Sequence, residues 1–328
     1  MKSNAVVTGG AGFIGSHLVD FLLSKNYEVT VLDNLSTGRI ENLKHCKDKI
    51  NFHKIDLSEN CNSIAEVISE ADFIFHLASL ADIVPSIKYP DIYFKANVQG
   101  TLNLLQNCNP KKLKKFVYAA SSSCYGLAKR FPTSESAEIV PEYPYALTKN
   151  IGEQLVMHWA KLYKLKSVST RFFNVFGTRS RTSGTYGAVF GVFLAQKIAG
   201  QPLTIVGDGT QKRDFTYVTD VCEGMYLAAQ SKFEREIFNI GSGNPQSVNY
   251  LAELIGGPKV YIPKRPGEPD VTHADISKAK SEIGYNPKIS FEEGVKKVLK
   301  NIDYWINAPV WTPEKIKTAT KEWFEYLG

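Results

Sequence analysis

The chain has 328 residues, 43% of them hydrophobic and 22% charged, which excludes a disordered or fibrous protein and favours a folded one. This length exceeds the roughly 100–200 residues of one core and predicts a second lobe. The net charge of +6 is scattered; its one basic run, Lys111, Lys112, Lys114 and Lys115, is typical of a solvated connection after a helix, so no nucleic-acid partner is expected.

The first half of the chain alternates short β-branched runs with longer amphipathic segments. Strands are predicted at Ala5–Val7, Glu28–Leu32, Asn51–Ile55, Phe73–Phe75, Phe116–Ala119 and Ser167–Arg171. Helices are predicted between them at Phe13–Lys25, Ile64–Ser69, Ile92–Cys108 and Tyr145–Tyr163. This repeated order implies an α/β fold with a Rossmann-type, doubly wound parallel sheet.

The pattern loosens after Arg171, where a smaller C-terminal α/β lobe for substrate is expected to begin. The features that follow are a glycine-rich stretch at Gly177–Gly191, a helix at Val192–Ala199, a turn at Gly207–Gly209, and strands at Arg213–Val221 and Ile237–Ile240. Two prolines and a glycine make Lys264–Pro269 a loop.

A glycine-rich loop joins the first predicted strand to the first predicted helix. Gly9, Gly12 and Gly15 leave room for a tight turn and for a pyrophosphate at the helix N-terminus. Asp33 ends the next strand, where its carboxylate can accept both adenosine ribose hydroxyls but repels a 2′-phosphate; Arg39, close by, would suit one. A dinucleotide is therefore predicted, with NAD favoured over NADP.

Five cysteines are odd in number and widely spaced, which indicates neither a disulfide framework nor a zinc site; they are Cys46, Cys61, Cys108, Cys124 and Cys222. No metal is expected, and a reducing cytoplasm fits. The N-terminus enters a strand at once, without the regions of a signal peptide, and no apolar span of about 20 residues follows. A membrane partner is therefore not expected.

Three motifs carry a family resemblance: Gly9–Gly15, Ser121-Ser-Ser-Cys-Tyr-Gly126 and Tyr145-Ala-Leu-Thr-Lys149. With them, the sequence resembles the extended short-chain dehydrogenase/reductase family over nearly the whole chain, and it is most similar to UDP-glucose and UDP-N-acetylglucosamine 4-epimerases. Further matches are Asn174–Gly177, the stretch Gly207–Tyr217, and Arg265 with Ala274-Asp275.

The resemblance implies an organisation and a cofactor. Residues 1–174 would form the NAD-binding Rossmann domain, with a return segment at 213–242, and residues 175–212 and 243–328 the nucleotide-sugar-binding lobe; a homodimer is implied through Ile92–Cys108 and Tyr145–Tyr163. The residues implied to hold NAD are Gly9, Gly12, Phe13, Ile14, Gly15, Asp33, Asn34, Ser36, Thr37, Gly38, Asp56, Leu57, Leu77, Ala78, Asn97, Tyr145 and Lys149.

Catalytic roles fall on Ser121, Tyr145 and Lys149. Tyr145 and Lys149 lie about one turn apart on one helix face, so the ammonium can lower the pKa of the phenol and make it a usable base. Ser121 occupies the position of the family's catalytic hydroxyl; strand-end capping is the alternative role. Residues implied to bind substrate are Ser122, Ser123, Asn174, Val189, Arg213, Arg265 and Thr272. Surface salt bridges are the alternative for the two arginines.

The two positions after Ser121 select among the family's reactions. The 4,6-dehydratases carry an aspartate and a glutamate where this chain has Ser122 and Ser123, and hydroxyls do not easily move a carbon-bound proton. The sequence therefore predicts 4-epimerisation of a nucleotide sugar through a transient 4-keto intermediate, and the resemblance implies that this sugar is UDP-linked. Thr272, being small, would admit an N-acetyl group beside C2. Dehydratase, decarboxylase and reductase reactions, and a non-catalytic sensor of NAD or nucleotide sugars, stay open.

Overall fold

A seven-stranded parallel sheet forms the centre of the computed structural model, which describes residues 2–59, 62–180 and 187–328. Its strand order is β11–β6–β5–β4–β1–β2–β3. The strands are β1 (Asn4–Thr8), β2 (Glu28–Asp33), β3 (Ile50–Lys54), β4 (Phe73–His76), β5 (Lys115–Ser121), β6 (Ser167–Phe172) and β11 (Arg235–Ile240). The predicted α/β fold with a doubly wound sheet is confirmed. Its switch point lies between β1 and β4, where the strand order reverses.

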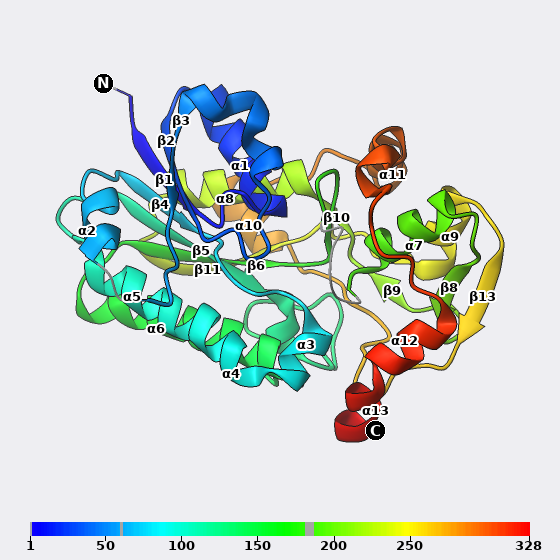
Figure 1. Ribbon diagram of the computed structural model, residues 1–328. Coiled ribbons are helices and arrows are strands. Elements are labelled where there is room, and N and C mark those ends of the chain that lie inside the picture. The colour runs from blue at the N-terminus through cyan, green and yellow to red at the C-terminus, as the bar shows by residue number, and fades with distance from the viewer. Residues whose placement is uncertain (1, 60–61, 181–186) are drawn as a thin grey trace.

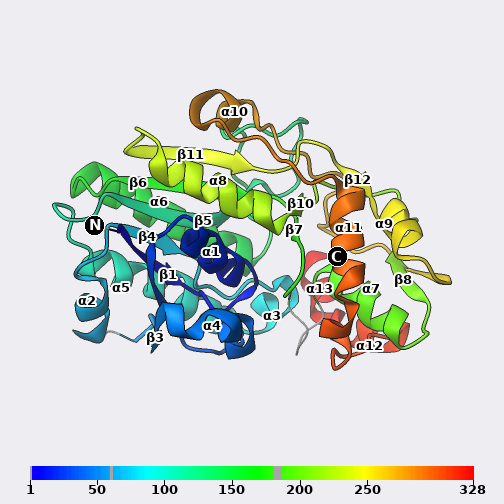
Figure 2. The same cartoon turned by 90° about the horizontal axis from the view of Figure 1, so that it is seen from above.

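Helices cover both faces of the sheet (Figures 1 and 2). On one face lie α1 (Phe13–Ser24) and α8 (Val218–Gln230), and on the other α5 (Gly100–Asn107) and α6 (Pro144–Leu162). Alternate strand residues divide between the two hydrophobic clusters: Val7 and Val117 belong to one, Val6 and Phe116 to the other. This alternation explains the continuous apolar runs, because strands buried on both faces need apolar side chains at every position.

The second part of the molecule lies beyond the carboxyl ends of these strands (right side of Figure 1). Two-stranded pairs link it together: β7 (Val175–Phe176) with β10 (Thr216–Tyr217), β9 (Lys212–Arg213) with β12 (Gln246–Ser247), and β8 (Leu203–Val206) with β13 (Lys259–Ile262). Its helices are α7 (Val189–Ile198), α9 (Val248–Ile255), α11 (Phe291–Lys300), α12 (Pro313–Ala319) and α13 (Lys321–Leu327).

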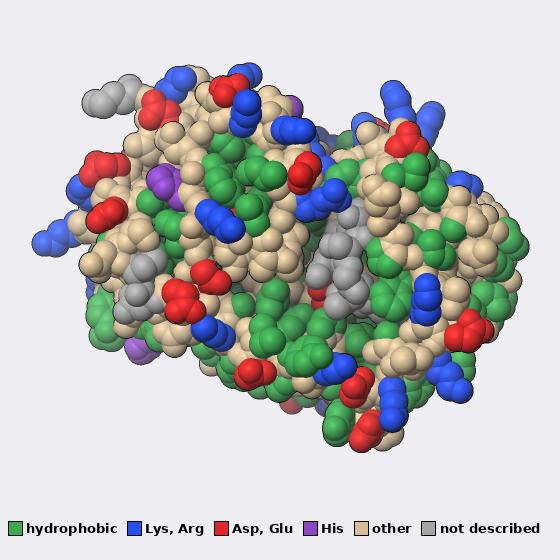
Figure 3. Space-filling view, viewed as in Figure 1, with side chains coloured by type: hydrophobic (Ala, Val, Ile, Leu, Met, Phe, Trp, Pro, Cys, Tyr) green, Lys and Arg blue, Asp and Glu red, His purple; other side chains and the backbone are tan. Residues whose placement is uncertain are grey.

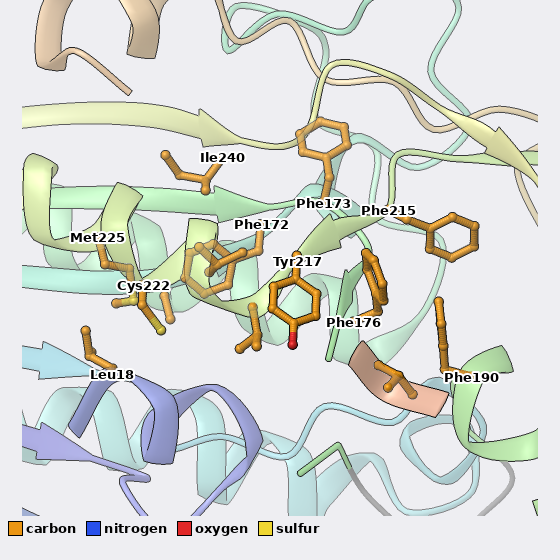
Figure 4. Packing of buried hydrophobic residues seen from close by; sticks show 14 of the residues in the cluster. Leu18, Phe172, Phe173, Phe176, Phe190, Phe215, Tyr217, Cys222, Met225 and Ile240 are labelled. Atoms are coloured by element: carbon orange, nitrogen blue, oxygen red, sulfur yellow. The ribbon is translucent and has the colours of Figure 1, made fainter. Parts of the chain in front are cut away.

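One hydrophobic cluster runs through both parts, and a group of packed aromatic rings forms its portion in the second part (Figure 4). The ring of Phe176 on β7 stacks on Phe190 of α7 with centroids 4.6 Å apart. Phe215 stacks on Phe291 of α11 at 5.0 Å and meets Phe176 edge-on at 6.1 Å. The same cluster continues to Leu18 of α1, so one hydrophobic core spans both parts.

Two expectations from the sequence are wrong. The segment Arg213–Val221, predicted as one strand, contains the last residue of β9, the whole of β10 and then the start of α8 at Val218. Its β-branched residues resemble a strand, but Val218 and Val221 are fully buried on the helix, so tertiary packing overrides local propensity. Lys115 is not solvated: it begins β5, is 4% exposed, and donates to the carbonyls of Ser231 and Phe233.

Several shorter elements complete the chain. The predicted helix at Ile92–Cys108 consists of α4 (Pro90–Tyr93), a π-helical segment η2 (Phe94–Gln99) and α5. Elements that were not predicted include η1 (Ile40–Lys49), α3 (Ile83–Lys88), η3 (Ser122–Tyr125), α10 (Ser277–Ile283) and η4 (Ile302–Trp305), as well as α9, α11, α12, α13, β7, β8, β12 and β13. The predicted helix at Ile64–Ser69 is α2 (Asn62–Ile68). Of the glycine-rich stretch, residues 181–186 lie outside the described part of the chain, as does Cys61.

Cys46, Cys108, Cys124 and Cys222 are free thiols. Within the described ranges, no helix has both the length and the apolar character to cross a membrane.

Candidate active site

A cavity of about 660 Å³ lies at the carboxyl ends of the central strands. It follows the switch point between β1 and β4 and extends to the second part of the molecule, and Figure 3 shows the surface hollowed between the two halves. The predicted catalytic and substrate-binding residues line it: Ser121, Tyr145, Lys149, Ser122, Ser123, Asn174, Val189, Arg213, Arg265 and Thr272. So do these predicted cofactor residues: Gly9, Gly12, Phe13, Ile14, Gly15, Asp33, Asn34, Ser36, Thr37, Gly38, Asp56, Leu57, Leu77 and Ala78.

The glycine loop leaves a cradle that side chains would fill. Gly9 has a φ of +68°, which favours glycine, and a Cβ on Gly15 would come within 2.1 Å of the Gly9 oxygen. Gly12 is the N-cap of α1 and has no side chain to bond the N–H groups of the first turn. Backbone donors at a helix N-terminus suit a pyrophosphate, so this loop fits the phosphates of a dinucleotide.

Asp33 is held rigidly at the edge of this cradle. Its Oδ2 accepts from the N–H of Ala11 at 3.0 Å and its Oδ1 from the N–H of Leu35 at 2.8 Å. Burial raises the pKa of this carboxyl, and the two backbone hydrogen bonds oppose that rise. The second lone pair of each oxygen can still accept a ribose hydroxyl, so the geometry suits an unphosphorylated ribose.

Asn97, which was predicted to bind the cofactor, is not among the residues that line the cavity. It is 1% exposed and lies in η2, where its Oδ1 accepts from the N–H of Leu80 at 2.8 Å and its Nδ2 donates to the Leu80 oxygen at 3.0 Å. Its Nδ2 also donates to Thr148 Oγ1. Asn97 therefore fixes Leu80, which does line the cavity, against α6.

Ser121 ends β5 with its hydroxyl turned toward the following turn. Its Oγ accepts from the N–H of Ser123 at 3.2 Å and from Ser123 Oγ at 2.8 Å, so the capping role considered from the sequence is present. Because both of these contacts use Ser121 as acceptor, its own hydrogen stays available to another oxygen. A hydrogen bond between Ser121 and Tyr145 also lowers the pKa of the phenol.

Tyr145 and Lys149 lie in the first turns of α6, which begins at Pro144. Burial lowers the pKa of Lys149 to about 7, and the charge of Glu153, one turn further on, opposes this. The Lys149 Nζ lies 4.5 Å from the centre of the Tyr118 ring. The pKa of Tyr145 is raised by burial, so the lowering expected from the sequence is wrong for this structure: desolvation outweighs the hydrogen bond to Ser121.

Two arginines face one carboxylate at the other end of the cavity. Arg213 Nη2 lies 2.9 Å from Glu268 Oε1, and Arg265 Nε lies 3.7 Å from Glu268 Oε2. Their side chains are 9% and 13% exposed, so these are not the surface salt bridges considered from the sequence. The site therefore brings two forked donors, which suit a diphosphate, to the carboxylate of Glu268.

Thr272 bonds in two directions at the same wall. Its Oγ1 accepts from the N–H of Asp214 at 3.0 Å and donates to Asn174 Oδ1 at 2.7 Å. The bond to Asn174 fixes the orientation of that amide, whose Nδ2 is then the donor that Asn174 can offer to a ligand.

Sequence reasoning missed several residues that line the cavity. Glu268 follows Arg265 by three residues in a loop that the sequence had singled out, so its charge was a usable signal. Tyr143 and Trp323 also line the cavity, but Trp323 lies in a C-terminal helix whose local pattern gives no sign of the site. Their role depends on tertiary contacts.

One cluster of potential metal ligands lies outside the cavity. Side-chain atoms of Asp20, His45 and Cys46 lie within 4.8 Å of one another, a grouping not expected from the sequence. His45 Nε2 contacts Asp20 Oδ1 at 2.6 Å, and Arg179 Nη1 lies 2.8 Å from Asp20 Oδ2. The guanidinium already balances the charge of Asp20.

Comparisons with known proteins agree with this geometry. The model of the NAD dependent epimerase/dehydratase family matches residues 5–241. A putative UDP-glucose 4-epimerase of Methanocaldococcus jannaschii is 36% identical over 90% of this chain and 96% of its own, and a UDP-N-acetyl-alpha-D-glucosaminuronate decarboxylase of Bacillus cytotoxicus is 32% identical over 92% and 98%. The structure of a UDP-N-acetylglucosamine 4-epimerase from Methanobrevibacter ruminantium, in complex with UDP-N-acetylmuramic acid, has a TM-score of 0.86 at 33% identity, covering 94% and 99%.

Proposed function

Because the chain belongs to the NAD-dependent epimerase/dehydratase family, we propose that it is a nucleotide-sugar 4-epimerase. Its substrates would be UDP-glucose and UDP-galactose, together with the N-acetylated pair. The observation that carries the proposal is one cavity whose lining includes Ser121, Tyr145 and Lys149 together with two arginines, Arg213 and Arg265, whose side chains are only 9% and 13% exposed. The names of the similar proteins support a UDP-sugar as the class of substrate.

The cofactor of this family is NAD, and the glycine cradle together with Asp33 would hold it. Bound NAD supplies the chemistry of hydride removal from sugar carbon 4 and hydride return to that carbon. The protein must therefore hold the cofactor tightly and exclude water from the reacting carbon.

Tyr145 would take the proton of the sugar 4-hydroxyl as the carbon–hydrogen bond breaks, leaving a 4-keto sugar, and would return that proton when the opposite face is reduced. Ser121 would turn the hydrogen that it shares with Tyr145 toward the same sugar oxygen, because Ser123 already supplies the hydrogens that its Oγ accepts. The charge of protonated Lys149 would oppose the rise that burial causes in the pKa of Tyr145, and so would favour the phenolate form.

Arg213 and Arg265 would hold the diphosphate, which leaves the sugar free to turn over between the two hydride transfers. Binding energy placed on the nucleotide diphosphate is the same in both orientations of the sugar. Because the diphosphate supplies the binding energy and the sugar can turn, one set of phosphate contacts can hold both C4 epimers.

A panel of UDP-sugars in D₂O, followed by proton NMR, tests the proposal. The expected result is interconversion of C4 epimers with no deuterium on any ring carbon, because the hydrogen leaves and returns as hydride. Dehydration would introduce solvent deuterium at carbon, and decarboxylation of a UDP-uronate would release carbon dioxide; either as the main product would contradict the proposal. The products of dehydration are looked for specifically in this assay, because Glu142 places a carboxylate in the cavity lining.

Tyr145→Phe is the matched variant for this assay. We expect kcat to fall by about 100-fold or more, because only the ionisable hydroxyl is lost. Co-purified NAD should stay at the parental level, measured after denaturation, since the ring still packs. Unchanged turnover would remove Tyr145 from the mechanism, and a protein that binds UDP-sugars without converting any of them would be a sensor.

A further inference from the structure

The C-terminal helix α13 contributes a buried tryptophan to the wall of the cavity. Trp323 is 3% exposed, although it lies only five residues from the end of the chain, and it is among the residues that line the cavity. Phe324 and Tyr326 on the same short helix are 41% and 66% exposed. The helix therefore directs one large side chain inward.

Trp323 makes two different contacts with the loop that carries Arg265. Its Nε1 donates to the Pro266 oxygen at 2.6 Å, and its ring lies 5.5 Å from Arg265 Cζ in cation–π geometry. The hydrogen bond fixes the backbone next to Arg265, while the ring supports the guanidinium itself. Both contacts act on the residue proposed to bind the diphosphate.

The other side of Trp323 faces the catalytic helix. Its ring lies 6.1 Å from that of Tyr143, the N-cap of α6, and the Tyr143 ring stacks on Tyr145 at 6.5 Å with an angle of 7°. Helix α13 also contacts α3, where Lys88 Nζ lies 4.0 Å from Glu322 Oε1. Trp323 thus lies between the Arg265 loop and the helix of the proposed base.

We propose that Trp323 is a positioning residue for nucleotide-sugar binding, which holds Arg265 in the orientation that meets the diphosphate. This inference rests on the proposed function, because it assigns the diphosphate to Arg265. Trp323 constrains both the side chain of Arg265, through its ring, and the backbone of the loop, through its hydrogen bond to the Pro266 oxygen. Trp323 then affects the affinity for the nucleotide diphosphate. It takes no part in the reaction at carbon 4.

Binding of UDP and of NAD, measured by calorimetry on the full chain, tests the proposal without turnover. Trp323→Ala should raise the Kd for UDP by about tenfold, the loss expected when a desolvated cation–π contact and its hydrogen bond are removed. The KM for the UDP-sugar should rise in parallel, while kcat and the Kd for NAD change by less than about twofold. Trp323→Phe keeps the ring and should restore part of the UDP affinity. Tyr326→Ala, on the exposed side of α13, is the control and should bind UDP as the parent does.

A double-mutant cycle with Arg265→Ala shows whether Trp323 acts through Arg265. In the Arg265→Ala background, Trp323→Ala should weaken UDP binding no further. Additive losses, an unchanged UDP affinity in Trp323→Ala, or an equal loss of NAD and UDP affinity would each overturn the proposal. If Trp323→Ala does not fold, the same cycle is measured with Trp323→Phe. Its loss of UDP affinity should then also disappear in the Arg265→Ala background. A parent protein that does not bind UDP would instead contradict the proposed function.

Discussion

Thr272 occupies a wall position where both the size and the hydroxyl of the side chain matter. The hydroxyl of Thr272 hydrogen-bonds to Asp214 and Asn174 and so helps to fix this wall. The small volume of the side chain is what would admit an N-acetyl group. These two roles can be separated by substitution, because valine keeps the volume and loses the hydroxyl, and tyrosine fills the space.

We expect the parent to interconvert the N-acetylated pair at rates within about tenfold of the plain hexoses, or ~1.4 kcal/mol in transition-state stabilisation. Thr272→Tyr should abolish the N-acetylated reaction and largely keep the hexose reaction, as measured by kcat/KM for both pairs. Thr272→Val is the control and should leave the ratio of the two activities unchanged. Equal loss of both activities in Thr272→Tyr would show that Thr272 does not act as a gate.

His76 is a buried histidine that should make stability depend on pH. Thr101 Oγ1 donates to the Asn97 oxygen and so accepts from His76 Nε2 at 2.9 Å, while His76 Nδ1 accepts from Thr8 Oγ1 at 2.7 Å. This arrangement requires the neutral ring. Burial lowers the pKa of His76 from 6.5 to about 3, with a smaller contribution from the charge of Lys149.

Between pH 6.5 and about 3, the unfolded chain binds a proton at this ring that the folded chain does not. The free energy of unfolding should therefore fall as the pH is lowered through this window, by up to ~1.4 kcal/mol per pH unit from this one group. In His76→Gln, urea unfolding between pH 6.5 and 4.5 should show a slope shallower by up to that amount. His158→Gln, on the exposed side of α6, is the control; identical slopes in all three proteins would contradict the prediction.

At the residue scale, the sequence could predict side chains that belong to contiguous motifs. Gly15, Ser121 and Tyr145 were found because the spacing of their neighbours has a chemical reason, and all three line the cavity. Glu268 was missed although its charge three residues after Arg265 was a usable signal, whereas the place of Trp323 at the cavity depends on contacts between segments far apart in the chain. The rise in the pKa of Tyr145 could not be predicted from the sequence either, because it depends on how deeply the ring is buried in the fold.

The turn between β1 and α1 is the element whose packing tolerates least change. A methyl group on Gly15 would collide with the Gly9 oxygen, so Gly15→Ala should move the helix away from the strand. We expect a loss of roughly 1–3 kcal/mol in the free energy of unfolding, together with loss of co-purified NAD. Gly100→Ala in α5 is the matched control: with a φ of −59° and its nearest neighbour at 3.5 Å, it should keep NAD and parental stability. Parental NAD content in Gly15→Ala would contradict the role of the cradle.

Elements with a strong period were predictable, and those that depend on their surroundings were not. Each strand predicted in the central sheet overlaps the observed one, because burial on both faces requires a continuous apolar run. The segment Arg213–Val221, predicted as one strand, instead enters α8 at Val218. The β-branched residues Val218 and Val221 are buried there on a helix. The π-helical η2 was not foreseeable either, since Asn97 is turned toward Leu80 by a tertiary hydrogen bond.

For the whole molecule, we propose a homodimer through the face formed by α4, η2, α5 and α6. These helices pack side by side, and apolar side chains on them are exposed, including Ile92 at 50%, Phe94 at 37% and Leu147 at 39%. Light scattering should give twice the chain mass of 36.5 kDa. Phe94→Glu with Leu147→Glu should give the single-chain mass, because a buried unpaired charge opposes association. Ile306→Glu, exposed on another surface, should remain dimeric; a monomeric parent would contradict the proposal.

The hydrophobic core that the two parts share has a consequence for how a sugar enters and leaves. Leu18 of the first part and Phe176 and Phe190 of the second belong to one packed cluster, and a hinge motion between the parts would open voids that dense interiors resist. Rigid-body opening of the two parts is therefore costly, so a sugar would enter and leave by local movement of segments that line the cavity, among them the Arg265 loop and α13. The rate of product release would then depend on that local movement, and substitutions in α13 could change it while the shared core stays as it is.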